Sequence, residues 1–157
     1  MKPKIIVTRD VPDKVESKLK EYFQVSFNRE DKIYVNDILI KAMENADGIV
    51  CTVTDSITDE LLSLPKKKVK IIANIGVGVD HIDLQSAKEN DVIVTNTPDV
   101  LTEATVDLAT LLLLSITRKA FHLEKMLRQG EWKGFSLTEG LGVDVRRKIL
   151  GIVGMGR

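Results

Sequence analysis

The chain has 157 residues and a mass of 17.5 kDa, which is enough for one domain with a sizeable core and at most a small addition. Lysine plus arginine and aspartate plus glutamate balance at 23 each, so no net charge draws the protein toward nucleic acid or an anionic membrane. The single cysteine, Cys51, excludes an internal disulfide framework and a cysteine-cluster metal site, and two histidines argue against a histidine-rich one.

The N-terminus runs from Met1 straight into an apolar strand, without the apolar core of a signal peptide, which predicts a cytoplasmic protein. The longest apolar block, residues 111–114, is far shorter than the roughly 20 residues that cross a bilayer. We therefore expect no association with a membrane.

Short apolar runs alternate with helical patterns over the first 98 residues, which is typical of βαβ units around a parallel sheet. The pattern predicts five strands, at residues 5–8, 24–27, 48–51, 69–74 and 92–95. It predicts four helices between them, at residues 13–22, 36–44, 59–63 and 84–89. Polar neighbours place the strand at residues 24–27 near an edge. Together these elements indicate an α/β fold with a flavodoxin-like parallel sheet.

Helical spacing also predicts which side chains face the core. They are Val15, Leu19 and Tyr22 in the first helix, and Ile38, Leu39, Ala42 and Met43 in the second. Residues that favour the N-cap position stand at the starts of the later helices: Asn36, Thr58 and Asp83.

No helix breaker occurs between Thr102 and Gln129, and Gly130 stands where a helix would end. The pattern predicts one long crossing helix of about 28 residues, roughly 40 Å in length. Its middle, residues 108–116, is apolar on nearly every face and requires cover on both sides. We therefore expect a homodimer or higher oligomer that associates through this helix, or a disordered tail after about Gly130.

The last stretch is an apolar run that breaks into glycines, KILGIVGMGR at residues 148–157. It predicts a strand at residues 149–153 that enters a phosphate-binding turn, with Gly154 and Gly156 at the first two positions of G-x-G-x-x-G. This would be the first strand of a truncated Rossmann domain, because the third glycine, the following helix and the acidic residue of that motif would lie after Arg157.

Ligands of an open parallel sheet bind beyond the carboxyl ends of its strands, which directs attention to the loops at residues 52–55, 75–83 and 96–101. In the second loop Gly76 and Gly78 flank Val77, so consecutive backbone N–H groups can converge on an anion. The spacing fits a carboxylate cradle, and it also fits an ordinary tight turn.

Other polar residues receive simpler interpretations. We expect His81 to be a turn or surface residue rather than a catalytic base, because no carboxylate pattern accompanies it. We expect Asp83 to cap a helix, His122 to pack or be solvated, and Cys51 to be a small core residue.

Four stretches occur in a fixed order: NIGVGVDHID at residues 74–83, VTNTPDV at 94–100, LTEATVDL at 101–108 and GIVGMGR at 151–157. Together they resemble the D-isomer-specific 2-hydroxyacid dehydrogenase family, and most closely its glyoxylate/hydroxypyruvate reductase branch. The resemblance covers the whole chain. It implies an oxidoreductase that reduces a small 2-oxo acid to a D-2-hydroxy acid with a hydride from NADH or NADPH.

The resemblance also implies site residues and domains. The substrate-binding positions would be Gly76, Val77, Gly78, Val53 and Leu101, the backbone of Val77 and Gly78 holding the carboxylate. The cofactor-binding positions would be Thr105, facing the nicotinamide, and Gly154, Gly156 and Arg157 at the start of the pyrophosphate loop. Residues 1–98 would form the substrate domain, 99–148 the interdomain helix with an irregular arm, and 149–157 the start of the NAD(P)-binding domain.

The Arg, Glu and His that carry catalysis in this family would lie after Arg157, so we assign no catalytic residue. We expect the isolated chain to be inactive and to bind NAD or NADP weakly or not at all. It would then be the N-terminal portion of such an enzyme, which a complementing C-terminal chain could complete. The alternative is a stand-alone flavodoxin-like module that binds a carboxylate or oligomerises.

Overall fold

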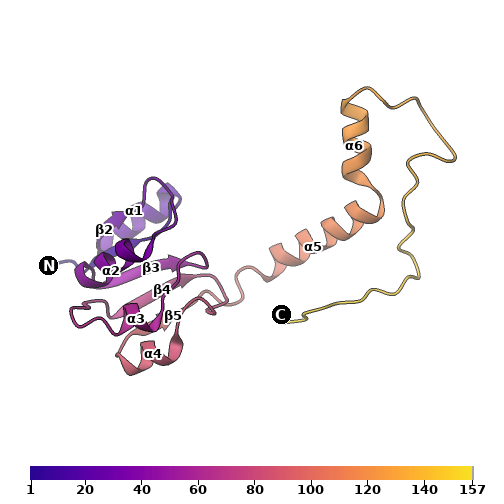
Figure 1. Ribbon diagram of the computed structural model, residues 1–157. Coiled ribbons are helices and arrows are strands. Elements are labelled where there is room, and N and C mark those ends of the chain that lie inside the picture. The colour runs from indigo at the N-terminus through magenta and orange to yellow at the C-terminus, as the bar shows by residue number, and fades with distance from the viewer. Residues whose placement is uncertain (157) are drawn as a thin grey trace. The chain divides into compact units, whose positions relative to one another are not determined.

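The computed structural model describes residues 1–156 (Figure 1). The chain divides into two compact units, Met1–Pro98 and Asp99–Arg157. Arg157, which the sequence assigns to a pyrophosphate loop, lies outside the described residues.

The first unit is a five-stranded parallel sheet with a helix in each connection. Its strands are β1 (Lys4–Val7), β2 (Gln24–Phe27), β3 (Gly48–Thr52), β4 (Ile71–Ile75) and β5 (Ile93–Thr95). Its helices are α1 (Asp13–Tyr22), α2 (Asn36–Asn45), α3 (Asp59–Leu62) and α4 (Leu84–Glu89). The strands lie in the order β2-β1-β3-β4-β5, and each neighbouring pair is parallel. This is the flavodoxin-like order, so the predicted fold class is confirmed, with β2 at an edge as expected.

The core packs α2, α3 and α4 against the central strands. Its fully buried side chains include Met43, Ile49, Leu61, Leu62 and Ile72. Burying an aliphatic side chain of this size contributes about 1.5–3 kcal/mol, so these contacts dominate the stability of the first unit. The predicted inward face of α2 is confirmed at Leu39, Ala42 and Met43, whereas Ile38 is exposed.

The helix caps are only partly as predicted. Asp83 is the N-cap of α4, and its carboxylate accepts from the backbone N–H of Ser86 at 2.9 Å, which confirms the prediction. Thr58 takes the N-cap position of α3 without a side-chain hydrogen bond. Asn36 is the first residue of α2, whose N-cap is Val35.

The predicted inward face of α1 is confirmed only in part, at the half-buried Leu19. Val15 and Tyr22 are exposed, and the buried residue is Glu16. Glu16 accepts from Lys20 at 2.8 Å and forms an ion pair with Arg29. Two cations satisfy the carboxylate there, so a charged residue takes the place that the apolar spacing assigned to Val15.

The second unit begins with α5 (Thr102–Thr117) and α6 (Ala120–Arg128). The prediction of one unbroken helix is therefore wrong. Lys119 adopts a left-handed conformation with φ of 54°, and the carbonyl of Thr117 accepts from Val143 N at 2.7 Å. A continuous helix would need that carbonyl for the N–H of Phe121. The break thus depends on a segment far along the chain, which helical periodicity does not report.

Residues 129–156 contain no helix or strand, so the strand predicted at residues 149–153 is not formed. Ile149 and Val153 are fully exposed. A strand satisfies its backbone groups by pairing with a neighbour, and residues 149–156 pair with no strand of the described chain. In the part of the chain that the structure describes, no helix combines the length and the apolar character that crossing a bilayer requires.

Candidate functional site

Three loops at the carboxyl edge of the sheet form the candidate site. They follow β3, β4 and β5, which are neighbours in the sheet. The last residues of β3 and β4, Thr52 and Ile75, are paired with each other, so the loops that follow start side by side. The loop after β4, residues 76–83, is called the glycine loop below. The loops after β3 and β5 lie on either side of it in strand order.

The glycine loop is held by an asparagine at the end of β4. Asn74 is buried, and its side-chain Nδ2 donates to the carbonyl of Gly76 at 3.2 Å and to the carbonyl of Gly78 at 2.8 Å. Its Oδ1 lies 3.1 Å from Nε2 of His81. One side chain therefore fixes two carbonyl groups of the loop.

Two residues that follow β5, Asn96 and Thr97, also form hydrogen bonds with the glycine loop. Thr97 donates its N–H to the carbonyl of Gly76 at 3.0 Å and accepts from the N–H of Gly76 at 3.1 Å. Asn96 donates from Nδ2 to the carbonyl of Val77 at 2.9 Å. The carbonyls of three consecutive residues, Gly76 to Gly78, are thus all accepting hydrogen bonds within the protein.

The N–H groups of the glycine loop behave differently. Within residues 1–156, the backbone N–H groups of Val77 and Gly78 donate to no protein acceptor. Val77 is exposed, and a Cβ built on Gly78 would meet only a carboxylate oxygen of Asp80, at 4.0 Å. Two consecutive unpaired donors beside open space make an arrangement that can accept an anion.

The loop after β3 lies against the glycine loop. Val53 is exposed, and its Cγ1 is 3.6 Å from a Cβ built on Gly76. The structure therefore brings Val53 and Gly76 together, as their joint assignment to one site requires. The remaining substrate-site assignment, Leu101, belongs to the second unit, where it is the N-cap of α5 and is exposed.

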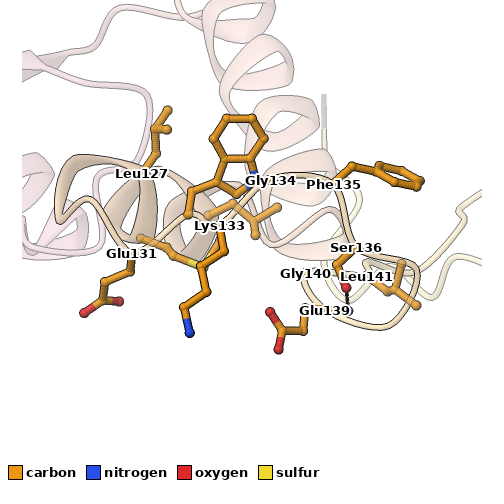
Figure 2. A pocket seen from close by; sticks show the side chains of 12 residues that line it. Leu127, Glu131, Lys133, Gly134, Phe135, Ser136, Glu139, Gly140 and Leu141 are labelled. Carbon is orange, nitrogen blue, oxygen red and sulfur yellow. Dashed lines mark hydrogen bonds between the residues drawn. The ribbon is translucent and has the colours of Figure 1, made fainter.

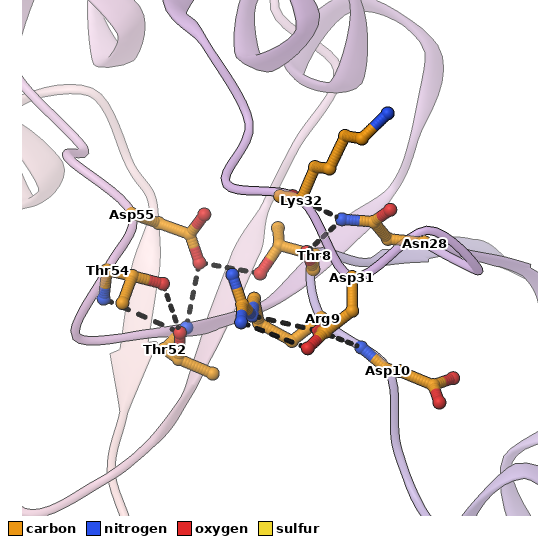
Figure 3. A network of polar contacts seen from close by, with 9 residues as sticks. All are labelled: Thr8, Arg9, Asp10, Asn28, Asp31, Lys32, Thr52, Thr54 and Asp55. Atoms are coloured by element: carbon orange, nitrogen blue, oxygen red, sulfur yellow. Dashed lines mark hydrogen bonds and ion pairs between the residues drawn. The ribbon is translucent and has the colours of Figure 1, made fainter.

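A buried carboxylate, which sequence reasoning missed, shapes the loop that carries Val53 (Figure 3). Asp55 is 1% exposed, and its Oδ2 accepts from Thr8 Oγ1 at 2.6 Å and from Thr52 N at 2.9 Å. Its Oδ1 has no hydrogen-bond partner among residues 1–156. Burial, together with the nearby charge of Asp55, raises the pKa of Cys51 to about 12, so this thiol stays protonated as a core residue. The sequence signal that could have indicated this turn is Asp55 three residues after Thr52, the last residue of β3, because an aspartate at this spacing can accept from the backbone N–H of the earlier residue.

His81 occupies a structural position. Its ring bonds Asn74, its carbonyl accepts from Ile57 N at 2.8 Å, and the following residue, Ile82, forms an isolated bridge with Ile57. The predicted turn role fits this geometry. Within the described residues, no three His, Cys, Asp or Glu side chains are arranged to hold a metal ion.

Of the residues assigned to the cofactor, the three that the structure describes, Thr105, Gly154 and Gly156, do not make a dinucleotide site. The hydroxyl of Thr105 donates to the carbonyl of Leu101 at 2.8 Å, one turn earlier in α5. Nothing lies within 4 Å of a Cβ built on Gly154 or Gly156, and residues 149–153 before them form no strand. A pyrophosphate site needs a strand, a tight turn and a helix N-terminus, so these residues do not fit the group by themselves.

The second unit contains an apolar pocket of about 480 Å³ (Figure 2). It is lined by one face of α6 and by the segment at residues 131–141, including Leu127, Trp132 and Phe135. Among the described residues, none that is assigned to the substrate or the cofactor lies in its wall. Its lining combines apolar side chains with the polar residues Glu131, Lys133, Ser136 and Glu139.

The strand order and the loops at the carboxyl edge identify the class of protein, an α/β domain of flavodoxin-like fold. The sequence model for the catalytic domain of D-isomer specific 2-hydroxyacid dehydrogenases matches residues 5–149. The chain therefore belongs to the D-isomer specific 2-hydroxyacid dehydrogenase family, and the resemblance inferred from the four sequence stretches is confirmed.

Individual relatives agree with this membership. The glyoxylate reductase of Thermococcus litoralis is 38% identical over 161 aligned positions, which take in 100% of this chain and 48% of that protein. The TT0316 protein of Thermus thermophilus superposes with a TM-score of 0.81 at 38% identity, over 90% of this chain and 45% of that one. The NADPH-dependent glyoxylate/hydroxypyruvate reductase of Sinorhizobium meliloti, solved with NADP and malonate, has a TM-score of 0.68 at 31% identity, over 93% and 44% of the two chains. The chain thus spans about half the length of the relatives that it matches.

Proposed function

We propose that this chain is the N-terminal, substrate-binding portion of an NAD(P)-dependent oxidoreductase that acts on the CH–OH group of D-2-hydroxy acids, in the manner of a glyoxylate/hydroxypyruvate reductase. Family membership and the names of the relatives support the reaction class. The match to only about half of each relative supports the assignment to an N-terminal portion.

The observation that carries the proposal is the pair of unpaired N–H groups at Val77 and Gly78. We assign them to the carboxylate of a 2-oxo acid, because backbone donors form strong hydrogen bonds to an ionised acceptor. Gly76 leaves room for this approach, and Val53 would cover the apolar side of the substrate. The family resemblance also assigns Leu101 to substrate binding. The Sinorhizobium relative was solved with malonate, which is itself a carboxylate.

Reduction of a 2-oxo acid requires a hydride donor facing the carbonyl carbon and a proton donor at the carbonyl oxygen. We assign carboxylate binding to the glycine loop, and we assign no proton donor there, because His81 is bonded to Asn74 within its turn. We therefore propose that the isolated chain is inactive and binds NAD(P) weakly or not at all. Thr105, Gly154, Gly156 and Arg157 would contact the cofactor only once a complementing C-terminal polypeptide supplies the rest of the domain.

The second unit supports a further part of the proposal, which is association with another polypeptide. Seven large apolar residues of α5 are exposed by 38% to 71% of their surface: Val106, Leu108, Leu111, Leu112, Leu113, Leu114 and Ile116. An apolar surface of this continuity favours burial against a partner. We propose that a second copy of this chain covers it.

A titration followed by ¹H–¹⁵N NMR spectra of the 157-residue chain tests the carboxylate assignment. On addition of glyoxylate or hydroxypyruvate, we expect the largest shifts at the N–H groups of Val77 and Gly78, because these donors would acquire an acceptor. Glycolaldehyde, which lacks the carboxylate, is the control ligand and is expected to leave both unchanged. Shifts that centre elsewhere, or none, would contradict the assignment.

An activity assay tests whether this chain lacks the catalytic groups and needs a C-terminal portion to supply them. We expect no oxidation of NADH or NADPH by the chain alone with glyoxylate, and oxidation when it is mixed with the C-terminal half of a related glyoxylate reductase. Activity of the chain alone would show that it contains the catalytic groups after all. Carboxylate binding without activity in either sample would favour the stand-alone binding module.

A further inference from the structure

Asn74 is a buried side chain, and every polar atom of its amide has a hydrogen-bond partner in the protein. It is 2% exposed, so every polar atom that it carries needs a partner inside the protein. Both hydrogens of Nδ2 have one, in the carbonyls of Gly76 and Gly78, and Oδ1 has one in the ring of His81. A buried amide with this complete set of bonds holds its neighbours in one arrangement.

The bond to the Gly76 carbonyl has a direct effect on the proposed donor at Val77. The carbonyl of Gly76 and the N–H of Val77 belong to one peptide unit, and the described chain contains no cis peptide bond. In a trans peptide these two groups point in opposite directions. Because Asn74 and the N–H of Thr97 together hold the carbonyl, the N–H of Val77 is turned away from the buried amide.

The carbonyls of Gly76 and Gly78 fix which way the Asn74 amide faces, and His81 and Cys51 lie at its oxygen. Its Nε2 lies 3.1 Å from Oδ1, where an imidazole N–H can donate to the amide oxygen. In the reversed orientation the amide oxygen would face the carbonyl oxygens of Gly76 and Gly78, with no hydrogen between them. The ring of His81 therefore supports the orientation in which Asn74 donates to the loop.

We propose that Asn74 is a positioning residue that sets the affinity of the glycine loop for the carboxylate of a 2-oxo acid. It acts through Gly76 and Gly78, by turning the N–H of Val77 outward, and His81 holds it in place. The affinity part of this inference rests on the proposed function. The conformational part does not, because the hydrogen bonds exist without any ligand.

The variant Asn74→Asp tests the inference with almost no change in side-chain volume. It replaces the donor by an oxygen that faces two carbonyl oxygens and cannot donate to them. In the ligand-free chain we expect the N–H resonances of residues 76–79 to move. In the glyoxylate titration we expect the dissociation constant to rise about tenfold or more, the scale of one hydrogen bond to a charged group.

The matched control is Asn45→Asp at the end of α2. Asn45 also donates from Nδ2 to a backbone carbonyl, that of Lys41 at 2.8 Å, but it is exposed. We expect this variant to leave the resonances of residues 76–79 and the glyoxylate affinity unchanged. A change seen in Asn74→Asp and absent in Asn45→Asp is then specific to the position of Asn74, and is not a general effect of replacing an asparagine by aspartate.

His81→Ala and His81→Gln provide a second route that leaves Asn74 itself in place. His81 is half-buried, and its replacement by alanine removes the ring nitrogen from Oδ1 of Asn74 and leaves only the longer contact from Sγ of Cys51, at 4.0 Å. We expect His81→Ala to shift the resonances of residues 76–79 and to weaken glyoxylate binding. His81→Gln can again place an N–H near that oxygen, so we expect it to restore both properties, which a purely structural role of the ring would not produce.

The outcomes separate this inference from the proposed function. Unchanged resonances of residues 76–79 in His81→Ala and in folded Asn74→Asp overturn the inference. Failure of glyoxylate to shift Val77 and Gly78 in the unaltered chain overturns the proposed function instead, and the ligand-free spectra then decide the role of Asn74 alone. If Asn74→Asp does not fold, the two His81 variants decide it.

Discussion

Glu16 is a carboxylate that the fold buries on α1 and satisfies with two cations. The hydrogen bond from Arg29, and then that from Lys20, lowers the pKa of Glu16 from its ordinary value of 4.5 to about 2. Arg29 also lies over the ring of Phe27, 4.9 Å from its centre, so its guanidinium joins α1 to the edge strand β2. Arg29 therefore contacts both Glu16 of α1 and Phe27 of β2.

The pH dependence of unfolding tests this pairing. A carboxyl whose pKa is lower in the folded state stabilises the fold above its unfolded pKa, and this contribution is lost as the pH falls through the folded pKa. We expect Glu16→Gln to lower the melting temperature at pH 6, and the difference from the unaltered chain to shrink between pH 4.5 and 2. Thermal unfolding followed by circular dichroism at several pH values measures this.

The control for that measurement is Glu60→Gln. Glu60 is an exposed carboxylate on α3 and makes no ion pair with any residue from 1 to 156. We expect its replacement to leave the melting temperature nearly unchanged at every pH. A difference for Glu16→Gln that persists undiminished at pH 2 would show that the ion pairs are not its cause.

At the scale of elements, the junction of α5 and α6 is a tertiary feature. A Cβ built on Gly142 would lie 2.5 Å from the carbonyl oxygen of Thr117 and 2.8 Å from Cα of Arg118. The absence of a side chain at Gly142 is what permits Val143 to reach the Thr117 carbonyl. The end of α5 is therefore fixed by a close approach of backbone from the following segment.

Gly142→Ala tests this account of the break. We expect the added methyl group to push residues 142–143 away, at a cost of about 1–3 kcal/mol, the range for overpacking. Hydrogen exchange of the Val143 N–H should then accelerate, and the resonances of residues 117–121 should move. Gly151→Ala is the matched control, because a Cβ there has no neighbour within 4 Å. Equal behaviour of the two variants would refute the close approach.

The elements that could be predicted from the sequence are those decided by nearby residues. The strands of the first unit follow from short apolar runs, and the Asp83 cap follows from a side chain three residues before its partner, Ser86. The features that sequence analysis missed depend on distant partners. Glu16 needs Arg29, the end of α5 needs Val143, and Asp55 needs Thr8 at the end of another strand.

The candidate site divides in the same way. The Gly76-Val77-Gly78 spacing fitted both a carboxylate cradle and an ordinary tight turn, and the structure adds that its carbonyls accept hydrogen bonds while the N–H groups of Val77 and Gly78 donate none. The role of Asn74 could not be predicted from the sequence, because the sequence does not show which backbone carbonyls an asparagine at the end of an apolar strand will bond. The terminal strand failed for a related reason: a strand needs a neighbour to pair with.

At the scale of the whole molecule, the exposed leucines of α5 predict association. We expect sedimentation velocity to show a dimer or a larger species whose fraction grows with concentration. Leu111→Glu places a charge on this surface, and we expect it to weaken association about tenfold or more, because burying one leucine contributes about 1.5–3 kcal/mol. Leu84→Glu, which changes an exposed leucine of α4 in the first unit, is the control. A monodisperse monomer at high concentration would contradict the prediction.

The residues that fix the glycine loop all precede the second unit in the chain. Asn74, Asn96 and Thr97 belong to Met1–Pro98, as do all five strands of the sheet. During synthesis on the ribosome, everything that shapes this loop is therefore made before the first turn of α5. The nascent chain can therefore form the glycine loop with all of its hydrogen-bond partners before the leucines of α5 are added.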